Sequence, residues 1–466
     1  MNSILNVFSI ASLLFIAGCI TPAKVQKSDI PTPMTWNTLA SSTHITNTPT
    51  TSIDQQWWQH FEDPTLTALL NEALQNNKSL AIAKARVLEA RANRGITRSA
   101  LFPQVNGKVD ASRGNLGALY NYQIIAQAEA GFDASWEVDF FGHNQARAAE
   151  AQALLQSAQA NEQAVVVGLL AEVARNYFDL CNDAHQIEIT RQNLDNQKKT
   201  LALIQAQVQG AMASDFDLQR AGAQVSTTES LIPSLQSAYD AAQNRLNVLL
   251  GAAPGAKNAL LTTTQPLKPL DPQIIVAAPA TVLANRPDVR ASERQLAATL
   301  SAHRAAVTDF FPRITLLGFY GLQTSKVDVM SPWSVGGNLI QPLLNFGRLR
   351  SQLKVASARQ AQAFYSYQQT VLEALENMEN SLSSFMHEYD RNHLLNTAVA
   401  QNRKAAELAK LQFRGGFTGL LDVLIAERNV LDAESALAAS DATLRKNLVA
   451  IYTAAGGGWD SPIAKN

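Results

Sequence analysis

The chain has 466 residues, with 38 Lys and Arg against 39 Asp and Glu, so its formal net charge is −1. This balance gives no electrostatic footprint for nucleic acid, and we expect no nucleic-acid partner. Hydrophobic residues make up 46% of the chain, which excludes a disordered protein. No apolar run of 18 or more follows the first 20 residues, which argues against a bundle of transmembrane helices. Two cysteines exclude a disulfide scaffold.

The N-terminus has the pattern of an export signal. Residues 7–16 form a short apolar stretch, and Ala17 and Gly18 lead from it to Cys19. This end resembles a bacterial lipobox, which predicts cleavage before Cys19 and a covalent lipid on its thiol, with no other cofactor. Ile rather than Asp follows the cysteine, which favours release to the outer membrane. The alternative is an ordinary signal peptide with a chance cysteine. If Cys19 is lipidated, Cys181 is the only free thiol left in the mature chain, and we expect it to be buried and inert.

The chain contains an internal duplication. Gly142 and Gly347 are 205 positions apart, and the same offset relates several later pairs. These pairs are Gly210 and Gly415, Asp217 and Asp422, Ala221 and Ala426, and Gly251 and Gly456. Upstream, Phe102-Pro103 matches Phe311-Pro312 at an offset of 209. The two repeats therefore differ in length between this proline and the glycine at 142 or 347. The sequence therefore predicts two structural repeats.

Each repeat has the pattern of a long helical hairpin. Residues 144–209 contain no proline and one glycine, and apolar residues recur every seven positions from Val166 to Val208. A sustained seven-residue repeat predicts a left-handed supercoil. A second stripe runs from Leu218 to Leu246, as expected for coiled-coil seams. Pro233 is expected to kink or break this second helix.

The second repeat has the same pattern. One stripe extends from Val371 to Phe413 and is interrupted by Asn392, and another extends from Val423 to Ile451. Gly210 and the Gly415-Gly416 pair are expected at the turns between the helices. Generic coiled-coil scaffolding is the alternative interpretation of the periodicity.

Two pairs of short segments precede the long helices and alternate between apolar and polar residues. The segments are 103–113, 122–139, 312–323 and 333–344. A period of two predicts half-buried strands, either over a soluble core or between lipid and a lumen. The lipobox favours the membrane. Four strands cannot close a barrel, and an open edge in lipid leaves backbone groups without partners. Protomers would therefore have to share one barrel.

The layout resembles the TolC-like outer-membrane efflux channels, in their lipidated branch (OprM- and NodT-like). The motifs that carry the resemblance are Trp57-Trp58-x-x-Phe61-x-Asp63-Pro64-x-Leu66, Leu80-x-x-Ala83-x-Ala85-Arg86, Phe102-Pro103, Trp136-Glu137-x-Asp139-x-Phe141-Gly142, Ala174-Arg175-Asn176-Tyr177, Asp217-x-x-x-Ala221, Leu249-Leu250-Gly251, Asn285-Arg286-Pro287-Asp288, Phe311-Pro312, Phe346-Gly347-Arg348 and Leu421-Asp422-Val423-Leu424. They extend from about residue 57 to residue 459.

The resemblance implies a mainly α-helical protein with four transmembrane β-strands per protomer. Three protomers would form a twelve-stranded barrel in the bacterial outer membrane and a helical barrel in the periplasm. The family works as a passive conduit, together with a periplasmic adaptor and an inner-membrane pump. The alternative function is a lipid-anchored periplasmic coiled-coil adaptor or structural protein. Two equivalent hairpins, each preceded by strands, argue against that alternative.

These features divide the chain into six parts. We expect a lipoprotein signal peptide at 1–18, a linker or equatorial segment at 19–60, and a first structural repeat at 61–251. An equatorial connection at 252–284, a second repeat at 285–456 and a tail at 457–466 complete the division.

The resemblance also implies a gate that closes like an iris at the periplasmic ends of the helices. The family often has two acidic residues three apart, whereas this chain has Asp422-Val423-Leu424-Ile425 and so lacks the second carboxylate. Three copies of Asp422 would surround one axis, Leu421 would supply an apolar constriction, and Arg428 an ion pair between protomers. Asp217 occupies the equivalent position of the first repeat and is a further candidate gate residue.

Helix capping is the alternative role of both aspartates. Asp217 and Asp422 fall in a first helical turn, where the helix dipole stabilises a carboxylate. The sequence from Ser214 to Asp217 has the pattern of a capping box. No catalytic motif and no metal-ligand spacing occurs in the sequence, so we expect neither an enzyme nor a metal site. The sequence names no exported substrate.

Overall fold

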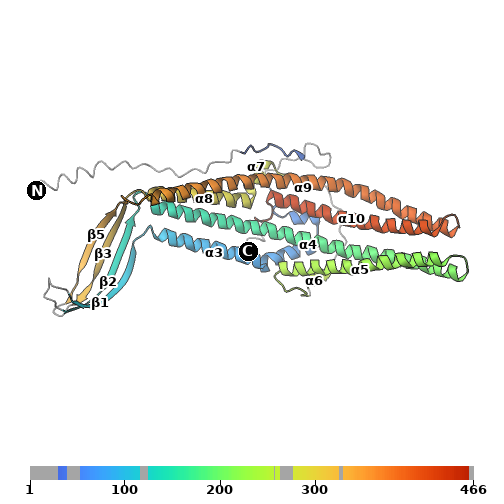
Figure 1. Ribbon diagram of the computed structural model, residues 1–466, viewed down its shortest axis with the longest axis horizontal. Helices are drawn as coiled ribbons and strands as arrows, with labels where there is room; N and C mark the ends of the chain where they lie inside the picture. Colours follow the sequence, from blue (N-terminus) through green and yellow to red (C-terminus); the bar gives the residue numbers. More distant parts are fainter. Residues whose placement is uncertain are drawn as a thin grey trace. The chain divides into compact units, whose positions relative to one another are not determined.

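The computed structural model describes residues 30–38, 53–115, 124–256, 258–262, 276–324 and 329–460. Figure 1 shows the helices and strands with their labels. In chain order they are η2 (Trp57–Phe61), α2 (Pro64–Asn76), α3 (Lys78–Ser99), β1 (Gln104–Asn115), β2 (Ile124–Val138), α4 (His143–Gln209), α5 (Asp215–Leu249), α6 (Ala259–Thr262), α7 (Pro279–Asn285), α8 (Pro287–Thr308), β3 (Arg313–Thr324), β4 (Val329–Met330), β5 (Trp333–Ile340), α9 (Arg348–Arg414) and α10 (Leu420–Ala455).

The described chain divides into two units, and each unit takes segments from both repeats. The sheet unit contains residues 97–150 and 296–361, with all the strands. The helical unit contains residues 30–96, 151–295 and 362–460. The strand segments of both repeats thus lie in one unit, and the helical hairpins of both lie in the other, except for the beginnings of α4 and α9 up to residues 150 and 361.

The sheet is antiparallel and follows the order β1, β2, β3, with β4 and β5 both paired to β3. The pairs Gln323–Met330 and Tyr320–Trp333 belong to one register, so β4 and β5 are a single strand interrupted at Ser331 and Pro332. Across this interruption the backbone amide of Gly321 still donates to the Pro332 carbonyl at 3.1 Å. The prediction of four strands is confirmed in this form.

The last strand is shorter than the sequence predicts. We expected it to extend over residues 333–344, but it ends at Ile340. Pro342 explains the difference, because proline has no amide hydrogen to continue the ladder. The chain then turns into α9 through residues 341–347.

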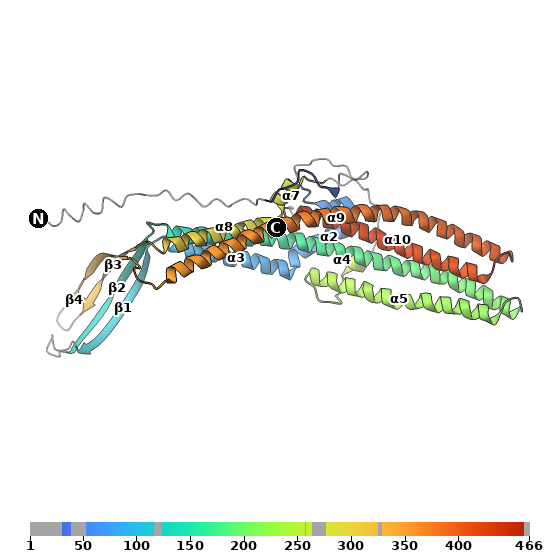
Figure 2. The ribbon, with the colours of Figure 1, turned by 45° about the horizontal axis from the view of Figure 1, so that its top comes forward.

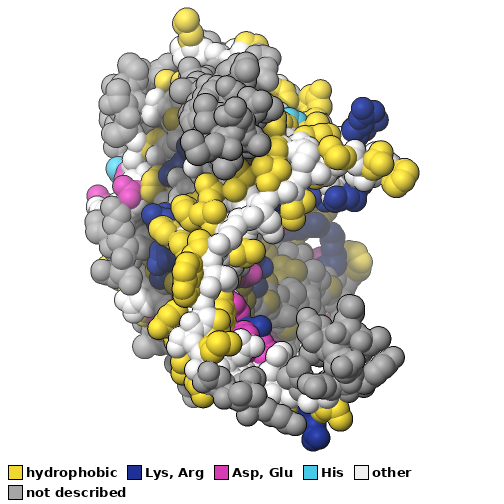
Figure 3. Space-filling view, turned by 90° about the vertical axis from the view of Figure 1, so that its left-hand side faces the viewer, with side chains coloured by type: hydrophobic (Ala, Val, Ile, Leu, Met, Phe, Trp, Pro, Cys, Tyr) yellow, Lys and Arg dark blue, Asp and Glu magenta, His cyan; other side chains and the backbone are white. Residues whose placement is uncertain are grey.

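The alternation of the strands gives the sheet one apolar face. Residues directly opposite each other in an antiparallel pair lie on the same face, so the registers place the alternate apolar residues of all strands together. Hydrophobic side chains gather over the strands in Figure 3. The large exposed side chains of this face are Val105, Val109, Ile124, Phe132, Leu316, Tyr320, Leu322, Trp333, Val335 and Leu339. Such a face suits lipid rather than water.

The two predicted hairpins are present in the helical unit, as α4 with α5 and α9 with α10 (Figure 2). The seven-residue stripe of α4 is buried from Val166 to Leu194, and that of α9 is buried at Val371, Met378 and Phe385. The interrupting Asn392 is also accounted for. Its amide nitrogen donates to the Asp441 carboxylate at 2.8 Å and to the Ser440 hydroxyl at 3.2 Å, so this polar residue pairs with α10.

Pro233 does not break its helix. The helix α5 is continuous from Asp215 to Leu249 with the proline inside it. Pro233 is exposed, and so is Glu229, whose carbonyl loses its helical hydrogen bond to the missing amide. Because water can reach that carbonyl, the helix tolerates the loss.

The core of the helical unit joins segments that are far apart in the sequence. Trp57 stacks on Tyr452 with ring centroids 5.7 Å apart, and Trp58 packs edge-on against Trp57. The indole nitrogen of Trp36 donates to the Ala277 carbonyl at 2.9 Å. The N-terminal segment, the connection before α7 and the end of α10 therefore pack into one cluster.

Candidate functional site

The two hairpin turns carry the residues that the sequence singles out. The turns follow Gln209 and Arg414, as predicted, and the helical ends beside them share one apolar cluster. We refer to this cluster as the tip cluster, and it consists of Ile204, Val208, Leu218, Phe413, Leu420 and Leu424. It draws on α4, α5, α9 and α10, so the ends of both hairpins pack against each other.

Asp217 completes the predicted capping box at the start of α5. The Ser214 hydroxyl accepts a hydrogen bond from the Asp217 amide at 3.2 Å, and the Asp217 carboxylate accepts from the Ser214 amide at 3.4 Å. The Ser214 hydroxyl also donates to that carboxylate at 2.7 Å. Both groups are therefore engaged in starting the helix.

Asp422 lies in the first turn of α10 and is exposed. The N-cap is Gly419, which offers no side chain, and the Thr418 hydroxyl donates to the Asp422 carboxylate. Asp422 therefore stabilises the turn through a threonine rather than through a capping box. Its carboxylate stays accessible beside the tip cluster.

Leu421 and Arg428 lie on one exposed face of α10. Spacings of three and four place Leu421, Ile425, Arg428 and Asp432 along the same side of the helix. The Arg428 Nε lies 3.7 Å from the Asp432 carboxylate, and both side chains are largely exposed. Ile425 occupies the position of the second family carboxylate, so this face is apolar near the turn and charged further along.

Two polar layers, which the sequence analysis missed, connect α4, α9 and α10 above the tip cluster. In the lower layer, the buried carboxylate of Glu427 accepts from Lys410 at 2.8 Å and from the Thr200 hydroxyl at 2.9 Å. The second oxygen of Glu427 has no hydrogen-bond partner among the described residues. An acidic side chain of α10 is thus held by one residue from each long helix.

The upper layer repeats this arrangement one heptad away. Glu434 accepts from Arg403 Nε at 2.7 Å and from the Asn193 amide at 2.9 Å. Each member lies seven residues from its counterpart in the lower layer. The sequence signal was available in this spacing, but a search for apolar stripes passes over polar residues at heptad positions. A cavity of about 350 Å³ lies between the layers and includes both glutamates and both cations in its lining.

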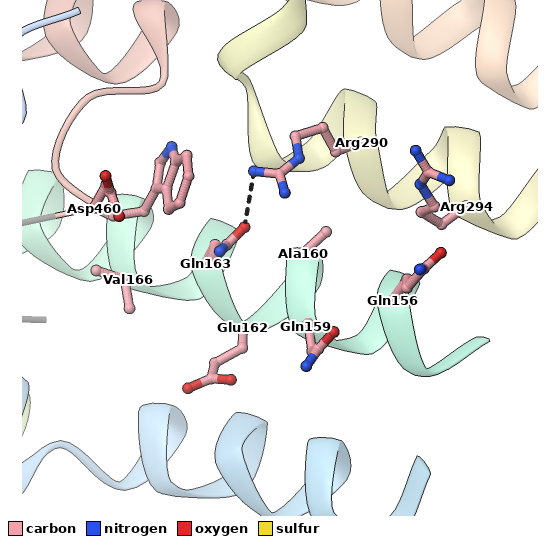
Figure 4. A pocket seen from close by; sticks show the side chains of 10 residues that line it. Gln156, Gln159, Ala160, Glu162, Gln163, Val166, Arg290, Arg294 and Asp460 are labelled. Atoms are coloured by element: carbon pink, nitrogen blue, oxygen red, sulfur yellow. Dashed lines mark hydrogen bonds between the residues drawn. The ribbon is translucent and has the colours of Figure 1, made fainter. Parts of the chain in front are cut away.

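A second cavity, of about 580 Å³, lies between α4, α8 and the segment after α10 (Figure 4). Arg290 reaches across it, with Nη1 donating to Gln163 at 3.3 Å and the guanidinium 5.1 Å from the centre of the Trp459 ring. Glu162 and Asp460 also line it, so its charge is mixed. Arg290 connects the C-terminal segment to both helices.

Cys181 is buried in α4, as predicted. Burial raises the pKa of its thiol to about 12. The neighbouring Tyr177 hydroxyl donates to Asp63 at 2.7 Å, and burial raises the pKa of this tyrosine as well. Asp63 in turn caps α2 by accepting from the Thr65 amide at 2.8 Å. The cluster thus fixes the start of α2 on α4.

The predicted lipid anchor Cys19 lies outside the described residues. Within the part of the chain that the structure describes, no helix is long and apolar enough to cross a membrane. The same residues contain no group of three or more His, Cys, Asp or Glu side chains placed to hold a metal ion.

The fold and the one-sided sheet define a TolC-like channel subunit. The chain belongs to the outer membrane efflux protein family, which it matches over residues 69–252 and 278–457. It is 29% identical to the pyoverdine export outer membrane protein OpmQ of Pseudomonas aeruginosa, over 98% of each chain. It is 28% identical to the cation efflux system protein CusC of Escherichia coli K12, over 96% of this chain and 97% of that one. The solved outer-membrane channel OprN matches with a TM-score of 0.89 and 30% identity, over 95% of this chain and 100% of that one.

Proposed function

We propose that this chain is the outer-membrane subunit of a tripartite efflux system and forms a passive homotrimeric conduit from the periplasm to the exterior. The two open edges of the sheet carry the proposal. Among the described strands, β1 pairs only with β2, and β5 pairs only with β3. Since the apolar face suits lipid, these edges need partners, and neighbouring protomers supply them by closing a shared barrel of twelve strands.

The helical hairpins extend this conduit into the periplasm. Exposed apolar residues on α9, such as Leu372, Leu394 and Leu411, would be covered by another protomer. A periplasmic adaptor and an inner-membrane pump supply the substrate and the energy, so the channel carries out no bond chemistry. The six parts expected from the sequence remain our division of the chain.

The periplasmic gate in this proposal is the exposed start of α10. Leu421 forms an apolar constriction, three Asp422 carboxylates surround the axis, and Arg428 pairs with the neighbouring protomer. A ring of carboxylates favours cations over anions. Asp217 lies at the corresponding turn of the other hairpin.

The lipid on Cys19 provides a second attachment to the outer membrane beside the strands. The relatives differ in the substrate that their names give, since one is a pyoverdine export protein and another belongs to a cation efflux system. We infer that the pump and the adaptor select the substrate, while the channel sets only size and charge limits.

Native mass spectrometry of protein extracted from outer membranes in detergent tests the proposal. The expected result is the mass of three mature chains, each beginning at Cys19 and carrying acyl groups. A Cys19→Ser variant should lose the acyl mass and keep the trimer, because the strands remain. A water-soluble, unlipidated monomer would overturn the channel and leave a periplasmic scaffold.

A further inference from the structure

The loop between β5 and α9 exposes large apolar side chains at the end of the sheet. Leu343, Leu344 and Phe346 are 84%, 87% and 100% exposed in the protomer. The loop follows directly from β5, whose Val335 and Leu339 belong to the apolar face. This exposed patch therefore continues the face that suits lipid.

Hydrogen bonds fasten the loop at both ends. The Gln341 amide nitrogen donates to the Phe310 carbonyl at 3.0 Å, and the Arg348 amide donates to the Asn345 carbonyl at 3.0 Å. The polar residues thus hold the backbone, while the apolar side chains point away from the chain.

Phe346 also has an uncommon backbone conformation. Its φ is 49° and that of Gly347 is 88°, so both residues lie in the left-handed region. A bulky residue rarely adopts this conformation unless the surroundings require it. A strained backbone that presents a fully exposed aromatic ring indicates a partner outside the protomer.

The internal duplication supplies a direct comparison. Phe141 is the counterpart of Phe346, and both are followed by glycine. The Phe141 ring stacks on Phe311 with centroids 5.0 Å apart, so the first repeat satisfies this position within the chain. In the second repeat, Phe346 is fully exposed in the protomer.

The first two turns of α9 are basic. Arg348, Arg350 and Lys354 are exposed, and residues 329–372 contain no Asp or Glu. None of these three cations forms an ion pair with another described residue. In the first repeat, by contrast, His143 stands at the position of Arg348 and lies 3.3 Å from Asp309.

We propose that residues 343–354 form a binding site for anionic phospholipid at the periplasmic end of the strands. The three apolar side chains enter the boundary between headgroups and acyl chains, where aromatic residues are favoured. The cations bind the phosphate groups, because guanidinium matches phosphate geometry and a juxtamembrane basic cluster attracts anionic lipid. This site rests on the proposed function, which places the strands in the bilayer.

The test is native mass spectrometry of the full-length protein in detergent, titrated with phosphatidylglycerol or zwitterionic phosphatidylcholine. Wild-type protein should retain phosphatidylglycerol preferentially. Replacing Arg348, Arg350 and Lys354 together by Gln should weaken that binding on the order of 100-fold, since each cation contributes roughly fivefold. Equal retention of both lipids by the wild type, or unchanged binding by the triple variant, would overturn the proposal.

A matched variant removes the same charge from the helical unit. Gln replaces the exposed Lys78, Arg175 and Arg191, and binding of phosphatidylglycerol should stay at the wild-type level. An equal loss in this control would reduce the effect to net charge and contradict a local site. Phe346→Ser should weaken retention about tenfold, because it removes apolar burial without changing charge.

The same mass spectra distinguish anionic phospholipid from a free anion and from a neighbouring copy of the chain. Displacement of the lipid by millimolar inorganic phosphate would indicate a free-anion site and overturn the lipid proposal. The Gln triple variant could lose the trimer, and a protein with Arg348→Lys and Arg350→Lys could form the trimer again without retaining lipid. Together these two results would show that the cations contact a neighbouring copy of the chain, and they would overturn the lipid site. A lipid-free wild-type trimer extracted from outer membranes would overturn only this site. A chain absent from those membranes would overturn the proposed function.

Discussion

Gly131 and Gly321 lie directly opposite each other on β2 and β3, and the ring of Phe319 covers both. A Cβ atom on Gly131 would lie 2.6 Å from the Tyr320 carbonyl oxygen and 2.9 Å from the Phe319 ring. A Cβ atom on Gly321 would lie 2.6 Å from the Ala130 carbonyl oxygen. The pair therefore allows a close approach of two strands, one from each repeat.

Gly131→Val should disrupt the junction between the repeats. The new side chain meets backbone atoms that cannot turn away, so we expect a loss of about 1–3 kcal/mol in sheet stability. The measurement is the fraction of heat-resistant trimer recovered from outer membranes. Gly318→Val is the matched control, because a Cβ atom there meets nothing closer than 3.8 Å, the residue lies on an inner strand and valine favours strands. Equal assembly of the two variants would contradict this explanation.

The elements that the sequence predicted well are those with a sustained period. Alternation placed the strands on β1, β2 and β3 within two residues, and the heptads placed the hairpin turns correctly. The effects of single prolines on the elements around them were harder to predict. Pro342 follows the end of a strand and Pro233 lies inside an intact helix, although proline lacks the amide hydrogen at both places.

The candidate site was partly accessible from the sequence. The capping role of Asp217 follows from local spacing, and the structure confirms it. The polar layers depend on three helices that meet in one register. Heptad spacing indicates the positions on each helix, but it does not show which residues of different helices contact each other. Phe141-Gly142 and Phe346-Gly347 are identical in sequence, so the phenylalanine that stacks within the chain and the one that is fully exposed cannot be distinguished without their surroundings.

Glu427→Ala should loosen the helices at the lower polar layer. The substitution leaves the Lys410 ammonium and the Thr200 hydroxyl without the carboxylate that both contact. Because Lys410 keeps partial access to water, we expect a loss of about 1–3 kcal/mol. Thermal unfolding of the purified trimer, followed by circular dichroism, measures the change.

A second glutamate provides the comparison for this layer. Glu407 forms an exposed pair with Lys404 at 2.8 Å on the same helix as Lys410. Exposed pairs contribute about 0–1 kcal/mol, so Glu407→Ala should unfold close to the wild-type temperature. A Glu427→Ala protein as stable as Glu407→Ala would show that the layer does not hold the helices together.

Asp422→Ala should raise the resting conductance of the channel in planar bilayers. It removes both the proposed ring charge and the hydrogen bond from Thr418 that fixes the turn. Asp422→Asn separates the two effects, since the amide keeps an acceptor but carries no charge. We expect Asp422→Asn to lower cation preference with a smaller rise in resting conductance.

The repeat again offers a matched control for the gate. Asp217→Ala breaks the capping box and should cost about 1 kcal/mol in helix stability, without a change in conductance. If Asp217→Ala and Asp422→Ala raise the resting conductance equally, loosening of the tips explains both results. If neither does, Asp422 has no part in closing the channel.

Cys181 should resist thiol reagents in the folded trimer. Its pKa of about 12 lies far above neutral pH, and the thiolate is the reactive form, so almost no nucleophile is present at pH 8. Iodoacetamide at pH 8, followed by intact mass measurement, should leave native protein unlabelled and add one adduct per chain after denaturation. Reactivity should stay low as the pH rises to 10, because burial blocks access as well as ionisation. Labelling of the native trimer at pH 8 would mean that the reagent reaches Cys181 in the folded protein. The hydrogen bond from Tyr177 to Asp63 would then not hold α2 firmly against α4.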